Sequence, residues 1–277
     1  MLVGVCKLCK EENELQRSHI LSKMVYRKIN KNNEGFYAFD GTKNLTQLTR
    51  LQHTAYMLCR GCETLFSQNE TRVSKLFNEI NNMNLEARKW LANIFPPNLE
   101  LALRRIAERR NLDSNALRGY DFFNRDNLND LKFYCLGIIL REAYNQENPN
   151  ISKNIKKKIE KYFNSNKALN VQMTVYVNTN QNDFMMASTS HTISVGKFFH
   201  SHCIFPNVFV YLHIREDNSI EQDCYTILPE DFFNIHPKSV PMISSINYFR
   251  KLLNESRVAQ NAKNKMIEDN LVISDII

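Results

Sequence analysis

The chain has 277 residues, of which 43% are hydrophobic and 23% are charged, and its formal net charge is +7. This length suffices to bury a hydrophobic core and suggests two or three structural units. The proportions of hydrophobic and charged residues are those of a globular protein. The sequence has no run of about 18 apolar residues and no secretory signal, which excludes a membrane span and favours the cytoplasm.

The positive charge is unevenly distributed along the chain. Residues 1–70 carry 10 basic and 7 acidic side chains, residues 71–170 carry 18 and 11, and residues 171–277 carry 8 and 11. The basic excess therefore lies in the first two thirds of the chain. This distribution is typical of a protein whose N-terminal and middle regions bind a polyanion such as nucleic acid, although a solvated basic surface would give the same pattern.

Residues 1–70 are expected to form short strands and loops around two C-x-x-C pairs, Cys6 with Cys9 and Cys59 with Cys62. Two such pairs can supply four thiolates to one tetrahedral zinc ion. The pairs are about 50 residues apart, which is wider than the usual spacing of zinc ribbons. Four unrelated buried cysteines or redox-active dithiols are the alternatives. A zinc ion with four thiolate ligands has no open position, so the sequence predicts a structural zinc.

The middle of the chain reads as helical. The spacing of apolar residues predicts a helix that begins near Cys62 and breaks near Asn69. A Lys-rich stretch at 151–163 is expected to be an amphipathic helix, because its apolar residues recur every four positions and its lysines face outward. The other helices are predicted over residues 85–95, 99–110 and 128–144.

The pattern changes to that of strands after residue 170. Segments around 171–177, up to 195, 203–214 and 220–228 predict a small antiparallel sheet, with a helix near 247–254. The expected fold class is therefore α+β, with an N-terminal zinc-bound module, a helical middle region and a C-terminal sheet. The predicted domains are 1–82, 83–168 and 169–277.

His19 lies between the two cysteine pairs in the segment Arg17-Ser18-His19-Ile20. A histidine in a hairpin between two zinc-binding cysteine pairs can act as a general base, because its pKa lies near the working pH. The order C-x-x-C, SHI, Asn44 and LC-x-x-CE resembles the HNH endonucleases, whose ββα-metal motif often lies between zinc knuckles. It resembles more closely a group of bacterial HNH-like proteins with an LC-x-x-CE-x-x-FS segment and a later helix that ends in Arg. Here that helix is Phe133 to Arg141.

The resemblance implies a treble-clef-like ββα fold and a role for each matching residue. His19 would activate water for attack on phosphorus, and Asn44 would orient His19. Glu63 would bind a single catalytic Mg²⁺ or Mn²⁺ ion, for which a carboxylate is a suitable ligand. The implied activity is metal-dependent hydrolysis of DNA phosphodiester bonds, as in effectors of bacterial defence systems, restriction modules or toxins.

Several residues depart from the HNH pattern. Ser18 stands where a metal-binding acid is usual, and the final histidine is absent. The alternative roles are, for His19, a hydrogen bond to a carbonyl or replacement of a cysteine at zinc, and, for Glu63, a carboxylate at a helix N-terminus that the helix dipole favours. The alternative functions are a degenerate zinc-stabilised module that binds nucleic acid without cutting it, and a protein-interaction scaffold. The C-terminal sheet would serve as a sensor, a dimer surface or a protein dock.

Histidines also lie before the second cysteine pair and in the C-terminal third of the chain. His53 precedes the second cysteine pair and is expected at the surface. His200 and His202 alternate along a predicted strand, so their side chains would share one face and could bind a metal ion. Polar residues that face outward from a sheet edge would give the same pattern.

Overall fold

The computed structural model describes most of the chain. The described residues are 2–30, 36–40, 45–85, 87, 123–145, 151–165, 167–183, 187–195, 197–217, 219–230 and 232. The helices expected over 85–95, 99–110 and 247–254 fall outside these ranges, apart from residues 85 and 87 at the start of the first. Within the described part, no helix has the length and apolar character needed to cross a membrane.

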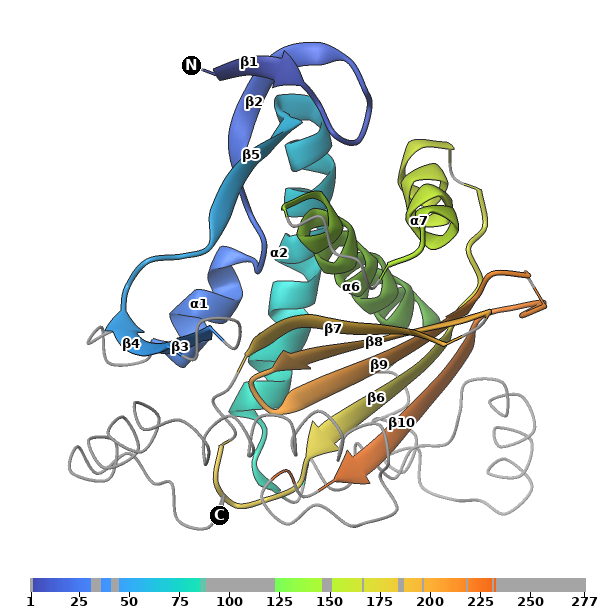
Figure 1. Ribbon diagram of the computed structural model, residues 1–277. Coiled ribbons are helices and arrows are strands. Elements are labelled where there is room, and N and C mark those ends of the chain that lie inside the picture. Colours follow the sequence, from blue (N-terminus) through green and yellow to red (C-terminus); the bar gives the residue numbers. More distant parts are fainter. Residues whose placement is uncertain are drawn as a thin grey trace.

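The N-terminal part is a three-stranded antiparallel sheet in the order β1-β2-β5. Its strands are β1 (Leu2–Val5), β2 (Glu12–His19) and β5 (Thr54–Cys59). The connection from β2 to β5 holds a short helix and a separate hairpin: α1 (Lys23–Ile29), β3 (Phe36–Asp40) and β4 (Leu45–Thr49). The hairpin lies beside α1, away from the cysteine pairs (Figure 1).

Helix α2 (Arg60–Asn82) follows β5 directly and runs for 23 residues. The break predicted near Asn69 is wrong. Asn69 is buried in the middle of α2, and its amide donates to the backbone carbonyl and the carboxylate of Asp130. A polar residue that reads as a helix breaker in the sequence is therefore a buried contact between two helices.

Helix α6 (Arg125–Asn145) is buried around most of its circumference, and α7 (Lys153–Ser165) is amphipathic. The sequence predicted both helices to within a few residues. Gly137 permits a close approach of α6 to α2, since a Cβ atom at this position would lie 2.9 Å from the ring of Phe66. In α7 the apolar stripe Ile155, Ile159 and Phe163 is buried, as its four-residue spacing indicates.

The C-terminal sheet has five strands in the order β10-β6-β9-β8-β7. They are β6 (Gln172–Asn178), β7 (Ser188–Val195), β8 (Phe198–Phe205), β9 (Val208–Arg215) and β10 (Cys224–Glu230). The predicted segment 203–214 is divided between β8 and β9 at Asn207, whose φ of 60° suits a tight turn and is tolerated by asparagine.

A purely antiparallel C-terminal sheet, as predicted, is wrong, because β10 pairs parallel to β6. Both edges of β9 are occupied by β6 and β8. After β9 the chain reverses direction and pairs with the free edge of β6, the strand next to β9. Since β6 runs antiparallel to β9, the reversed strand runs parallel to β6.

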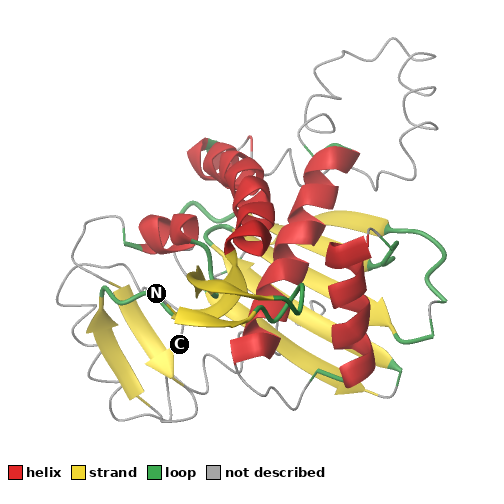
Figure 2. Ribbon diagram, turned by 90° about the horizontal axis from the view of Figure 1, so that it is seen from above, coloured by secondary structure: helices red, strands yellow, loops and turns green. Residues whose placement is uncertain are grey.

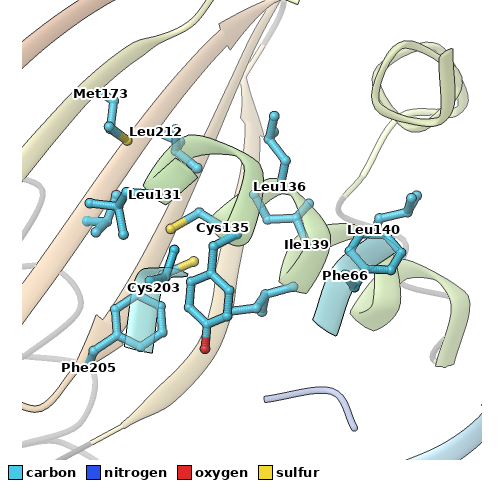
Figure 3. Packing of buried hydrophobic residues seen from close by; sticks show 14 of the residues in the cluster. Phe66, Leu131, Cys135, Leu136, Ile139, Leu140, Met173, Cys203, Phe205 and Leu212 are labelled. Carbon is cyan, nitrogen blue, oxygen red and sulfur yellow. The ribbon is translucent and has the colours of Figure 1, made fainter. Parts of the chain in front are cut away.

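Helices α2, α6 and α7 lie on one face of the five-stranded sheet (Figures 1 and 2). Leu131 and Cys135 of α6 face Cys203 and Leu212 of the sheet, while Phe66 of α2 lies beside α6 on its other side (Figure 3). One buried cluster continues from Leu8 through these residues to Ile227. The three regions read from the sequence thus share a hydrophobic core, and their boundaries remain a prediction.

Candidate metal centre and adjoining polar site

The four predicted zinc ligands come together at one end of the three-stranded sheet. Cys6 and Cys9 lie in the turn between β1 and β2, which the Cys6 backbone N–H closes by donating to the Glu11 carbonyl at 2.8 Å. Cys59 ends β5 and is the N-cap of α2, and Cys62 lies in the first turn of α2. Strand pairing of Leu15 with Cys59 brings the two halves together.

The geometry of the four sulfur atoms fits one metal ion such as zinc. All four lie within 4.8 Å of one another, and the Sγ atoms of Cys9 and Cys59 are 3.8 Å apart. A tetrahedral ion with Zn–S bonds of about 2.3 Å separates its sulfur ligands by about 3.8 Å. Among the residues that the structure describes, this is the one group of three or more metal-ligand side chains.

The electrostatics of the cluster also favour a bound cation. Burial acts to raise the pKa of Cys6, but backbone N–H groups, first that of Cys59, outweigh it and lower the pKa to about 7. Burial raises the pKa of Cys62, and the neighbouring sulfur atoms of Cys59 and Cys6 raise it further. The protein alone thus stabilises ionisation of one thiol at the expense of another, and a divalent ion would let all four ionise.

His19 ends β2, about four residues along that strand from the level of Cys59. Its ring is partly buried. Burial lowers the pKa of His19, as does the charge of Lys23, while a hydrogen bond with the Gln52 side chain and the charge of Glu63 act in the opposite direction. The net pKa lies below the ordinary value for histidine, so the ring is neutral at pH 7 and able to accept a proton.

A buried ion pair fixes the backbone at His19. Nη1 of Arg141 on α6 donates to the His19 carbonyl at 3.1 Å and to Glu70 of α2 at 2.6 Å. The Arg141 side chain is 3% exposed, and its guanidinium lies 4.6 Å from the ring centroid of Phe66. Two helices therefore hold the end of β2 in place.

Ser18 Oγ, Glu63 Oε1 and Arg141 Nε are buried polar atoms that have no hydrogen-bond partner among the described residues. Orphaned buried polar atoms are rare in folded proteins, and each calls for an explanation such as a bound ion or water. Glu63 also acts electrostatically on His19, which places its carboxylate in the same neighbourhood. The Glu63 carboxylate near His19 is thus chemically able to bind a cation or a hydrogen-bond donor.

The other predicted site residues have different positions. Asn44 lies outside the described residues. Exposed Ser67, one turn after Glu63, donates to the Thr64 carbonyl at 3.1 Å. His53 is exposed, as expected, and its Nε2 is 3.1 Å from the side-chain amide of Asn145. In the described part of the chain, His19, Glu63 and Glu70 do not form a three-ligand metal group.

The histidines of β8 lie on one face of the sheet. Nδ1 of His200 is hydrogen-bonded to the Tyr211 hydroxyl, and the ring of His202 is 5.0 Å from that of Tyr211. His200 also lies against His213, with ring centroids 4.6 Å apart. Neither histidine belongs to a group of three or more metal ligands in the part of the chain that the structure describes.

The sequence indicated no role for Arg141 or Gln52. Arg141 interrupts the apolar run Leu136–Leu140 of a buried helix, and a charged residue there is a signal of a buried ion pair. Gln52 carries no such signal, because its contact with His19 depends on the loop before β5.

No protein-family model matches the chain, and no curated protein and no solved structure matches it.

Proposed function

We propose that this protein is a zinc-stabilised, HNH-like endonuclease that hydrolyses phosphodiester bonds of DNA. The observation that carries the proposal is the position of His19, whose pKa is lowered: the charge of Glu63 acts on its ring, and buried Arg141 donates to its carbonyl. The order of these elements supports a treble-clef-like ββα arrangement: a cysteine turn, antiparallel strands β2 and β5, and a helix that carries the second cysteine pair.

In this proposal His19 accepts a proton from the attacking water, which requires its neutral form at working pH. The carbonyl of His19 is held by Arg141, so the ring is carried by a fixed backbone. Glu63 is suited to hold a Mg²⁺ or Mn²⁺ ion, since its Oε1 is a buried acceptor that receives no hydrogen bond from the part of the chain that the structure describes. Such an ion would stabilise the charge that develops on the scissile phosphate. The cysteine-bound zinc would brace the fold only, because four thiolates leave no open position.

The test is nicking of supercoiled plasmid by the purified zinc-loaded protein with Mg²⁺ or Mn²⁺. We expect His19→Ala to lower the nicking rate by at least 100-fold, the range that general-base catalysis contributes. His200→Ala is the matched control, because it removes a partly buried histidine from the distant sheet. Equal rates for wild type and His19→Ala would sink the assignment of His19 as the base.

Glu63→Gln tests the metal role separately. The amide keeps the shape of the side chain and removes its negative charge, so the concentration of Mn²⁺ that gives half-maximal nicking should rise at least tenfold. An unchanged Mn²⁺ requirement, with nicking intact, would exclude Glu63 as the metal ligand.

One observation favours a binding module that does not cut. Ser18 is fully buried beside His19, so the position that usually supplies a metal-binding acid offers only a hydroxyl. A protein of this kind would bind DNA in a salt-dependent manner, and neither Mg²⁺ nor Mn²⁺ would produce nicking.

A further inference from the structure

Lysines from two distant parts of the chain gather around Tyr144, at the end of α6. Nζ of Lys7, in the first cysteine turn, donates to the Tyr144 carbonyl. Nζ of Lys10 and Nζ of Lys156 lie 5.5 and 4.8 Å from the centroid of the Tyr144 ring. Lys7 and Lys156 are about 150 residues apart in sequence, so this grouping exists only in the folded chain.

The positive charge of this cluster is incompletely balanced. Glu160 accepts from Lys10 at 3.2 Å and from the Tyr144 hydroxyl at 2.8 Å. Burial lowers the pKa of Lys156; Glu160 acts in the opposite direction, and the charges of Lys10 and Lys7 lower the pKa further. Glu160 thus offsets part of the charge of Lys10 and Lys156, whereas Lys7 donates to a backbone carbonyl. Such a concentration of like charge creates a potential that attracts anions.

A second row of lysines extends the cluster along α7. Lys153, Lys157 and Lys161 are exposed and recur every four residues, so they form one stripe of the helix beside the stripe that holds Lys156 and Glu160. We call these three, together with Lys7, Lys10 and Lys156, the lysine surface. Its exposed row lacks hydrogen bonds and ion pairs to other described residues, so its ammonium groups are available to a ligand.

The lysine surface adjoins the His19 site across the last turn of α6. Tyr144 and Arg141 are three residues apart, so they lie one above the other on one face of the helix, about 4.5 Å apart along its axis. Arg141 holds the His19 carbonyl, and Asn145 contacts His53 in the loop that leads to β5. Asn145 and exposed His53 thus connect the end of α6 near the lysines to the strands that carry His19, and a chain-like ligand that crosses them would approach both.

We infer that the lysine surface binds the phosphodiester backbone of a nucleic acid and directs it to the His19 site. This inference rests on the proposed function and adds the place where the substrate lies. Lysine ammonium groups contact phosphates without reading bases, so binding here positions the nucleic acid and carries little sequence preference. An anionic membrane surface carries similar charge. Membrane binding, however, would not explain why the lysine surface lies next to the His19 site.

The experiment compares two double variants of the full-length, zinc-loaded protein. In Lys153→Gln with Lys157→Gln, two lysines of the exposed row lose their charge. In Lys75→Gln with Lys197→Gln, two exposed lysines of α2 and of the β7–β8 connection lose theirs. All four positions are solvent-exposed, so both variants should fold, which far-UV circular dichroism and thermal melting would verify.

Binding to a labelled 20-base-pair DNA duplex is measured by fluorescence anisotropy between 50 and 200 mM salt, without added Mg²⁺ or Mn²⁺. The slope of log K against log salt should fall by about 1.8 in the Lys153/Lys157 variant, because each neutralised phosphate contributes about 0.9. The control variant should keep the wild-type slope. A single-stranded 20-nucleotide RNA in a second arm distinguishes RNA from DNA as the bound backbone.

Unchanged slopes in the Lys153/Lys157 variant, or equal losses in both variants, would overturn the inference. So would absence of nucleic-acid binding together with lysine-dependent retention on phosphatidylserine vesicles. Nicking is assayed in parallel with Mn²⁺. Lysine-dependent binding without nicking would contradict the proposed nuclease function and support the lysine surface as a binding site. Nicking together with binding that does not depend on these lysines would support the nuclease function and contradict the lysine surface.

Discussion

Strands β1 and β9 show two ways in which one chain stabilises a sheet. In β1 the side chains of Leu2, Val3 and Val5 are 49%, 65% and 60% exposed. In β9 the alternate residues Val208, Val210, Leu212 and Ile214 are fully buried under the helical layer. A strand of the five-stranded sheet is thus held by apolar burial, whereas β1 buries little and is tied to the molecule through the cysteine turn that follows it.

The comparison indicates that the stability of the five-stranded sheet depends on apolar burial, whereas that of the three-stranded sheet depends on a metal crosslink. The five-stranded sheet has a continuous apolar layer against α6, which is the usual requirement for a stable sheet. The three-stranded sheet lacks such a layer under β1, and small folds with this deficit usually rely on metal or disulfide crosslinks. Metal should therefore control the N-terminal part far more than the C-terminal part.

Removal of the metal is the strongest way to break the comparison. Structural zinc contributes about 10–16 kcal/mol in zinc-finger peptides, so Cys62→Ser or chelation should unfold the three-stranded sheet. We expect amide exchange to become fast in β1 and β2 and to stay slow in β6 and β9. Elemental analysis should give one zinc per wild-type chain. Cys224→Ser, a partly buried cysteine outside the cluster, is the control and should change neither quantity. Equal exchange in both sheets after chelation would contradict the comparison.

The next largest effect should come from Arg141, which connects α6 to Glu70 of α2 and to the His19 carbonyl at the end of β2. Arg141→Met leaves Glu70 without its partner, and breaking a buried ion pair costs about 3–5 kcal/mol. We expect about 3 kcal/mol in denaturant unfolding, the lower end of that range, because the Glu70 side chain is 22% exposed. Arg72→Met is a matched control: it also breaks an Arg–carboxylate pair between α2 and α6, but the Arg72 side chain is 55% exposed. That loss should be about 0–1 kcal/mol. Similar losses in the two variants would refute a special role for the buried pair.

These two predictions also mark what the sequence could and could not indicate. The cysteine cluster follows from local spacing, because each C-x-x-C pair is a short turn that pre-forms half a metal site. Helices α6 and α7 follow from apolar periodicity in the same way. Arg141, by contrast, gains its role from Glu70 and His19, which are 71 and 122 residues away in sequence.

The errors have the same origin. Asn69 looks like a helix breaker until Asp130 of another helix supplies its hydrogen bonds. The parallel pairing of β10 depends on which edges of β9 and β6 are already occupied, and this is a property of the whole sheet. Local patterns thus predict elements, whereas partner identity depends on topology.

A smaller effect is expected at the contact between α2 and α6. Gly137→Ala places a methyl group 2.9 Å from the Phe66 ring, and overpacking of this kind costs about 1–3 kcal/mol. The higher helix propensity of alanine offsets about 1 kcal/mol of this. We expect a net loss of up to about 2 kcal/mol in denaturant unfolding and a displaced Phe66, which supports the Arg141 guanidinium. Gly61→Ala, at an exposed helical position with open space around it, is the control. A higher free energy of unfolding for Gly137→Ala would contradict this expectation and show that the Phe66 ring moves aside at little energetic cost.

The smallest effect concerns the titration of His19, which NMR can follow with or without catalytic activity. The pKa of His19 should lie below 6.5, chiefly because the ring is partly buried. Glu63→Gln removes a negative charge and should lower this pKa further, whereas Lys23→Met removes a positive charge and should raise it. In the proposed mechanism the neutral ring is the base, so nicking activity should rise with pH through the His19 pKa and then level off. Shifts of the same sign in the two variants would contradict the arrangement of charges around His19.

The 50-residue separation of the cysteine pairs has a consequence for how the chain can vary. The entropy lost when a flexible loop closes grows only with the logarithm of its length, by about 0.6 kcal/mol for each doubling. Compared with a ribbon loop of about 20 residues, the longer connection therefore costs less than about 1 kcal/mol, a small fraction of what a structural zinc contributes. Loop closure thus permits residues to be inserted or removed between the cysteine pairs while the four sulfur atoms still meet, outside α1, whose Val25 and Tyr26 are buried in the core.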